Sequence, residues 1–114
     1  MTMDLTDGIE SWTVITLSGD VDLASAPALR QQLADASEVA PSFLIIDLSG
    51  LDFIDSTGLG VLVGTLRRVR ATGGDVRLAG ASTSTARVFS VTGLDRVFGL
   101  YPTVDAAREA SPAR

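Results

Sequence analysis

Three residue types that carry much of protein chemistry are missing from this sequence. It contains no cysteine and no histidine, and all nine basic residues are arginines, so lysine is missing too. Without cysteine the chain can form no disulfide and no thiolate metal site. Without histidine it lacks the commonest general base and the commonest metal ligand. Without lysine it can build neither a P-loop nor a Schiff base, so we expect no metal site and no enzymatic activity.

Charge and hydropathy exclude two further kinds of partner. The formal net charge is -5, whereas nucleic-acid binders present a basic face. No apolar run approaches the roughly 18 residues that a membrane-spanning helix needs. Residues 1–7 also lack the basic start and the apolar stretch of a signal peptide. The sequence therefore predicts a cytoplasmic domain that binds neither nucleic acid nor membrane.

The pattern of strands and helices predicts an α/β domain. With 114 residues, the chain is long enough for one domain with its own core, which we place at residues 3–110, followed by a C-terminal tail at 111–114. Hydrophobic periodicity predicts strands at residues 3–6, 11–18, 43–48, 75–79 and 97–101, and helices at 26–38, 57–70, 82–91 and 102–109. The order ββαβαβαβα favours a mixed central β-sheet of about five strands with about four α-helices.

Turn and cap residues set the expected ends of these elements. Asp7-Gly8 suits a tight hairpin turn. Residues 19–22 are expected to break the second strand, and Ser25 to cap the helix that follows. Residues 49–55 are expected to form a loop between a buried strand and the next helix.

The most informative stretch is residues 51–60, Leu-Asp-Phe-Ile-Asp-Ser-Thr-Gly-Leu-Gly. It places the hydroxyl pair Ser56-Thr57 between Asp55 and the start of a helix. One interpretation is structural, with Ser56 as the N-cap of that helix. A catalytic serine is not favoured, because it needs an activating base and the side chain of the adjacent Asp55 diverges from it.

Two other patterns have weaker functional interpretations. Asp20-Val21-Asp22 follows a strand, as in phosphotransferases that form an aspartyl-phosphate, but those enzymes also need a lysine; the alternative is a pair of surface carboxylates, one capping the next helix. Gly58-x-Gly60-x-x-x-Gly64 is one residue off the dinucleotide-binding motif G-x-G-x-x-G. The alternative here is close backbone approach, to the sheet or to a partner.

Four segments of the chain together resemble a known family. They are residues 48–60, residues 17–22 (Leu-Ser-Gly-Asp-Val-Asp), residues 73–78 (Gly-Gly-Asp-Val-Arg-Leu) and residues 88–94 (Val-Phe-Ser-Val-Thr-Gly-Leu). In order and spacing they resemble the STAS domain and, more narrowly, the bacterial anti-sigma factor antagonists of the SpoIIAA type. The resemblance covers residues 3–108 and implies the STAS (SpoIIAA-like) fold.

The resemblance also implies a phosphorylation switch. In that family the serine directly after the loop aspartate, here Ser56, is phosphorylated by a partner, an anti-sigma factor serine kinase. The unphosphorylated antagonist binds this anti-sigma factor and releases the sigma factor, whereas phosphorylation at Ser56 switches binding off. A serine phosphatase resets the cycle. The nucleotide belongs to the kinase, so the antagonist itself holds no cofactor.

The expected partner-binding residues surround Ser56, and they are Asp22, Asp55, Thr57, Gly58, Leu59 and Gly60. Structural alternatives remain open for several of them: helix capping for Asp22, interaction with the helix dipole for Asp55, and helix–sheet packing for the two glycines. Thr57 is the alternative phosphate acceptor. Two other functions also remain open, a STAS subunit of a stress-signalling or lipid-transport complex and a small phosphotransferase.

Overall fold

The computed structural model describes residues 1–7 and 12–110 of the chain. This part is centred on a five-stranded sheet with the strand order β1-β2-β3-β4-β5. The strands are β1 (Thr2–Asp7), β2 (Trp12–Val21), β3 (Phe43–Ile54), β4 (Asp75–Ala79) and β5 (Gly99–Tyr101). β1 pairs antiparallel with β2, and each later pair is parallel. The predicted mixed sheet in an α/β domain is therefore confirmed. The turn expected at Asp7-Gly8 extends beyond the described residues, and the expected tail lies outside them.

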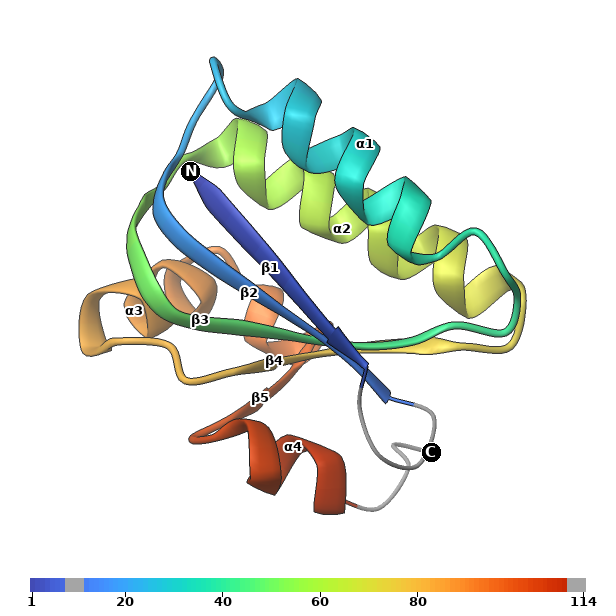
Figure 1. Cartoon of the computed structure of the whole chain (residues 1–114). Coiled ribbons are helices and arrows are strands. Elements are labelled where there is room, and N and C mark those ends of the chain that lie inside the picture. The colour runs from blue at the N-terminus through green and yellow to red at the C-terminus, as the bar shows by residue number, and fades with distance from the viewer. Residues whose placement is uncertain (8–11, 111–114) are drawn as a thin grey trace.

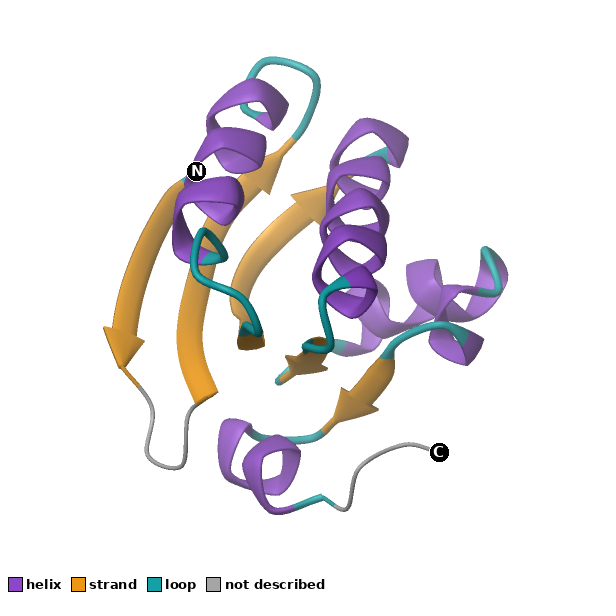
Figure 2. Cartoon of the chain, turned by 90° about the vertical axis from the view of Figure 1, so that its right-hand side faces the viewer, coloured by secondary structure: helices purple, strands orange, loops and turns teal. Residues whose placement is uncertain are grey.

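Helices cover both faces of this sheet. Those in the described part of the chain are α1 (Ala26–Ala36), α2 (Ser56–Ala71), α3 (Thr83–Val91), α4 (Val104–Glu109) and the 3₁₀ turn η2 (Leu94–Arg96). Figures 1 and 2 show α1 and α2 side by side over one face, with α4 on the other. The last strand begins at Gly99 instead of the predicted residue 97, because the N–H groups of Val97 and Phe98 both donate to the carbonyl of Leu94 in the turn that follows η2.

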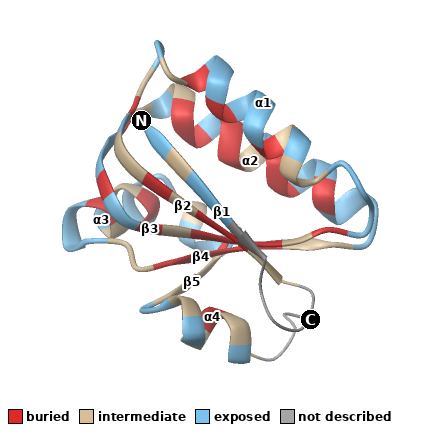
Figure 3. Ribbon diagram, in the orientation of Figure 1, coloured by how far each residue is buried: buried red, intermediate tan, exposed pale blue. Residues whose placement is uncertain are grey.

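The main core lies between the sheet and the helix pair α1 and α2. Figure 3 shows buried residues along the middle of the strands and on the sides of the two helices that face the sheet. Burial of such aliphatic side chains is the dominant favourable term in folding. The largest fully buried members are Ile15, Leu17, Leu29, Leu33, Leu44, Ile46, Leu48, Leu62, Leu66, Leu78 and Phe89.

Strands β2 and β3 run further than the sequence pattern predicts. The expectations that residues 19–22 break β2 and that residues 49–55 form a loop are wrong, because β2 continues to Val21 and β3 to Ile54. The two strands stay paired through two register shifts that absorb the extra residues of β3. Gly19 has a φ of 81°, which glycine adopts without a steric penalty. Cross-strand pairing thus outweighs the low strand propensity of glycine and aspartate.

A smaller cluster on the opposite face holds α4 in place. Arg77 of β4 is only 4% exposed, and its guanidinium carbon lies 4.5 Å from the ring centroid of Trp12 and 5.7 Å from that of Tyr101. Its Nη1 donates to the backbone carbonyls of Ala107 and Ala110. These carbonyls lie at the C-terminal end of α4, where a cation is stabilised by the helix dipole.

Replacing this buried guanidinium is expected to destabilise the domain. In Arg77→Met the carbonyls of Ala107 and Ala110 lose a charged donor, so the free energy of unfolding should fall by about 2 kcal/mol. Urea titration followed by the emission of Trp12, the single tryptophan, measures the loss. Arg87→Met removes an exposed arginine of α3 and should change stability little. Equal losses in both variants would contradict the role assigned to Arg77.

Candidate functional site

The carboxyl ends of β2 and β3 meet at one end of the sheet, where the predicted site residues gather. Val21 is paired with Ile54, the last residue of β3. The next backbone N–H, that of Asp55, donates to the carbonyl of Val21 at 3.1 Å. The start of α2 is therefore tied to the end of β2 by the main chain.

Asp55 caps helix α2, and Ser56 is its first residue. The backbone of Asp55 is extended (φ -101°, ψ -177°), and its Oδ1 accepts from the N–H of Gly58 at 3.0 Å. The interpretation of Ser56 as the N-cap is therefore wrong. Ser56 is exposed, and its hydroxyl has no hydrogen-bond partner among the residues that the structure describes. The cap of α2 leaves this hydroxyl free of any structural role.

A compact turn follows β2 on the other side of the site. The Oδ1 of Asp22 accepts from the N–H groups of Ala24 and Ser25, each at 3.1 Å, and the hydroxyl of Ser25 accepts from the N–H of Asp22 at 2.9 Å. Ser25 stands at the N-cap position of α1 as predicted, but its side chain bonds back into the turn and caps no helical N–H. The half-buried carboxylate of Asp22 is thus engaged in holding the turn.

The glycines and Leu59 divide between the interior and the surface. Gly58 is buried, and a Cβ built on it would lie 2.6 Å from Cγ1 of Val21 and 2.8 Å from Cγ1 of Ile54. Leu59 is buried in the main core. Gly60 is exposed, with no atom within 4 Å of the position its Cβ would occupy. Among the predicted partner-binding residues, Gly60 is therefore exposed, while Asp22, Asp55 and Thr57 are half-buried.

Two large apolar side chains at this end were not identified from the sequence. Leu23, in the turn after β2, is 73% exposed, and Phe53, near the end of β3, is 52% exposed. Phe53 is paired with Asp20 across the two strands, so the side chains of both residues project from the same face of the sheet. A sequence signal existed for Leu23, since it is an isolated apolar residue within a polar turn. None existed for Phe53, because it stands next to another large apolar residue, Ile54, and the sequence does not tell which of the two faces the core.

The site is strongly acidic for its size. Residues 18–29 and 49–66 contain no arginine. The same two ranges contain four carboxylates, those of Asp20, Asp22, Asp52 and Asp55. We call the surface formed by these four residues together with Leu23, Phe53, Ser56, Thr57 and Gly60 the strand-end surface.

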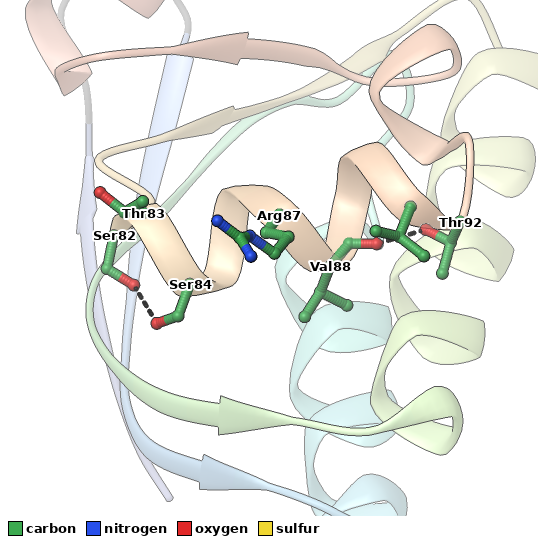
Figure 4. Close-up of a pocket in the computed structure, with 7 residues that line it drawn as sticks. Ser82, Thr83, Ser84, Arg87, Val88 and Thr92 are labelled. Carbon is green, nitrogen blue, oxygen red and sulfur yellow. Dashed lines mark hydrogen bonds between the residues drawn. The ribbon is translucent and has the colours of Figure 1, made fainter.

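Two hollows lie outside the strand-end surface. One, of about 720 Å³, runs along α3 and is lined by Ser82, Thr83, Ser84, Arg87, Val88, Val91 and Thr92. Figure 4 shows Ser84 and Val88 projecting to the same side of this helix. The other, of about 330 Å³, lies near the start of β3 and includes Val39 and Phe43 in its lining.

Neither a metal-binding cluster nor a membrane-spanning helix is found in residues 1–7 and 12–110. These residues include no group of three or more His, Cys, Asp or Glu side chains that could hold a metal ion. None of their helices is long and apolar enough to cross a membrane.

Because Asp55 caps α2 and Ser56 does not, replacing each with alanine should change the free energy of unfolding by different amounts. Asp55→Ala removes the acceptor for the N–H of Gly58, so the free energy of unfolding should fall by about 1 kcal/mol. Ser56→Ala removes a hydroxyl that bonds to nothing described, and it should leave stability unchanged. Thermal and urea unfolding of both variants measures the difference. A larger loss in Ser56→Ala than in Asp55→Ala would contradict the assigned cap.

Gly58 is buried and Gly64 is exposed in α2, so replacing each with alanine should change stability in opposite directions. Gly58→Ala pushes a methyl group into Val21 and Ile54, so we expect a loss of roughly 1–3 kcal/mol in the free energy of unfolding. Gly64→Ala adds a methyl group in open space and should stabilise the helix by up to about 1 kcal/mol. Urea titration of the two variants separates these signs; stabilisation by both would show that Gly58 is not needed for helix–sheet packing.

Comparison with known proteins identifies the family. The family model of the STAS domain matches residues 1–107. An anti-sigma-B factor antagonist of Bacillus subtilis is 37% identical over 86 residues, which make up 75% of this chain and 78% of the relative. The crystal structure of an anti-sigma factor antagonist from Mycobacterium paratuberculosis is 35% identical, with a TM-score of 0.82 over 94% of this chain and 90% of that one.

The anti-sigma factor antagonist SpoIIAA is also similar, and it has been solved in two states. Its unphosphorylated form is 25% identical, with a TM-score of 0.80 over 95% of this chain and 94% of that one. The phosphorylated form of Bacillus SpoIIAA is 25% identical, with a TM-score of 0.73 over 95% and 97% of the two chains. The resemblance carried by the four segments is thus confirmed over almost the whole sequence, and the chain belongs to the STAS domain family.

Proposed function

We propose that this chain is an anti-sigma factor antagonist whose binding is switched off by phosphorylation of Ser56. The observation that carries the proposal is the position of the Ser56 hydroxyl, exposed at the first residue of α2 and free of structural bonds. The relatives named anti-sigma factor antagonists support the choice of partner. The partner is a kinase-type anti-sigma factor, and binding it releases the sigma factor for transcription, which places the chain in the cytoplasm.

The start of α2 suits a phosphate acceptor. The kinase transfers the terminal phosphoryl group of ATP to the Ser56 oxygen, the bond to the β-phosphate breaks, ADP leaves, and the hydroxyl proton passes to a base of the kinase. A phosphate at this position lies at a helix N-terminus, where unpaired N–H groups and the helix dipole favour negative charge. Because Asp55 supplies the cap, phosphorylation need not disturb the fold.

The same phosphate opposes docking. It adds about -1.5 to -2 charges to a surface that already carries four carboxylates. For transfer, the kinase must hold its nucleotide against the Ser56 oxygen, so the new phosphate faces the phosphates that remain on that nucleotide. Like-charge repulsion of roughly 3 kcal/mol would reduce affinity by more than about a hundredfold. The existence of phosphorylated SpoIIAA with the same fold supports a switch that acts on binding and leaves the fold intact.

The predicted partner-binding residues take two roles in this proposal. Asp22, Asp55, Thr57 and Gly60 contact the anti-sigma factor, since each is at least partly exposed. Gly58 and Leu59, which are buried, act from beneath by seating α2 on the strand ends. A separate serine phosphatase removes the phosphate and restores binding. The chain supplies a surface and an acceptor hydroxyl, and the chemistry is that of its partners.

Variants at Ser56 test the switch directly. Ser56→Ala should bind the kinase-type anti-sigma factor as tightly as the unmodified chain and resist phosphorylation, whereas Ser56→Asp should fold but bind at least about tenfold more weakly. Calorimetry measures the affinities, and mass spectrometry after incubation with kinase and ATP locates the phosphate. Phosphate on Thr57 alone, or tight binding by Ser56→Asp, would contradict the proposal. Specific capture of a transporter ATPase subunit instead of a kinase would favour the lipid-transport role.

A further inference from the structure

Leu23 and Phe53 are exposed although the residues beside them are well packed. Leu23 is 73% and Phe53 is 52% exposed. Val21, two residues before Leu23, and Ile54, directly after Phe53, both belong to the buried main core. This end of the sheet is therefore well packed, and the two exposed side chains are additions to a complete core. Single exposed apolar side chains are common on protein surfaces, but these two stand at the carboxyl ends of β2 and β3, next to the start of α2 where the proposed partner docks.

The backbone that carries both side chains is held in place by hydrogen bonds and strand pairing. Leu23 is carried by the turn in which the Oδ1 of Asp22 accepts from two successive N–H groups. Phe53 is carried by a strand whose pairing with β2 continues past it to Ile54. A segment whose backbone is already ordered loses little backbone entropy on binding, which suits an anchor residue.

The charges around these residues specify the chemistry of the partner. Asp20 is paired with Phe53, Asp22 precedes Leu23, and Asp52 precedes Phe53, and no arginine lies in residues 18–29 or 49–66. A partner with a purely apolar patch would desolvate these carboxylates without compensation. A partner whose apolar patch is bordered by arginine or lysine would pair with them.

We propose that Leu23 and Phe53 are the apolar anchors of the docking surface, and that each contacts an apolar part of the anti-sigma factor bordered by arginine or lysine side chains. This inference rests on the proposed function, because it takes the anti-sigma factor as the partner. In this inference much of the affinity for the anti-sigma factor comes from Leu23 and Phe53, neither of which is phosphorylated. Asp20 and Asp52 pair with the basic side chains of the partner. Phosphorylation of Ser56 then determines whether the surface that Leu23 and Phe53 anchor can remain bound to the anti-sigma factor.

The anchors are tested with the full chain and the kinase-type anti-sigma factor that binds its unmodified form. Leu23→Asn and Phe53→Asn should each weaken binding by at least about tenfold, measured by calorimetry. Val39→Asn is the matched control, because Val39 is also an exposed apolar side chain (80%) but lies before β3, at the opposite end of that strand. It should bind as the unmodified chain does. Unchanged unfolding midpoints establish that all three variants fold.

The charge pairs have their own test. The double variant Asp20→Asn with Asp52→Asn should slow association and reduce the salt dependence of the association rate, because fewer carboxylates then attract the basic side chains of the partner. Asp95→Asn removes an exposed carboxylate in η2 and should change neither quantity. An association rate that is equally salt-dependent in the double variant and the unmodified chain would overturn the basic border.

The outcomes separate this inference from the proposed function. If Ser56→Asp loses binding while Leu23→Asn and Phe53→Asn bind normally, the anchors are overturned and the switch stands. Val91 lines the hollow along α3 and is 79% exposed. If Val91→Asn abolishes binding while Leu23→Asn and Phe53→Asn do not, the anchors are likewise overturned. If the unmodified chain binds no kinase-type anti-sigma factor, both the switch and the anchors are overturned.

Discussion

The parallel pairing of β2 with β3 beyond their apolar centres is the constraint on which the site depends. It continues until Val21 meets Ile54, and the N–H of Asp55 then donates to the carbonyl of Val21. Every bond in this sequence of contacts belongs to the main chain. The first residue of α2 is therefore placed relative to the end of β2 by main-chain hydrogen bonds, and the side chains of Asp22 and Asp55 add the turn and the helix cap.

Helical geometry then decides which of those side chains face outward. Residues spaced by four along a helix share one face, and Ser56, Gly60 and Gly64 are all exposed. Gly58 and Leu62, on the opposite face, are buried against the sheet. The small outward-facing residues leave the first two turns of α2 open to close approach by another protein, while the inward-facing residues hold the helix still.

Local patterns in the sequence were sufficient to predict the order of the elements and the mixed sheet. They failed where contacts between distant residues determine the end of a strand or the exposure of a side chain. Strand β4 was predicted with its observed bounds, because Asp75–Ala79 is a short alternating segment between glycines. The ends of β2 and β3 were missed because their extension depends on pairing with each other, which neither segment reveals alone. The exposure of Phe53 was missed for the same reason, since a register shift between the strands changes which side chains face the core.

At the N-cap of α2, the sequence alone could not decide between two neighbouring residues. Aspartate and serine are about equally good N-caps, and the sequence places them side by side as Asp55 and Ser56. The end of β3 selects the first of the two, since Asp55 is the residue whose N–H reaches Val21. The role of Ser56 as phosphate acceptor and the contacts of its neighbours stay predictions from the family resemblance.

The carboxylates of the strand-end surface differ in what they can do for a partner. Asp22 and Asp55 each have an oxygen engaged by backbone N–H groups, so their charge is fixed in place by the fold. Asp20 and Asp52 are exposed and can turn toward an incoming cation. A partner that brings a nucleotide to Ser56 brings more negative charge to this surface, and it can dock only if its own cations compensate. In the proposed switch, binding is then a small difference between opposing electrostatic contributions, so one added phosphate is expected to weaken it strongly.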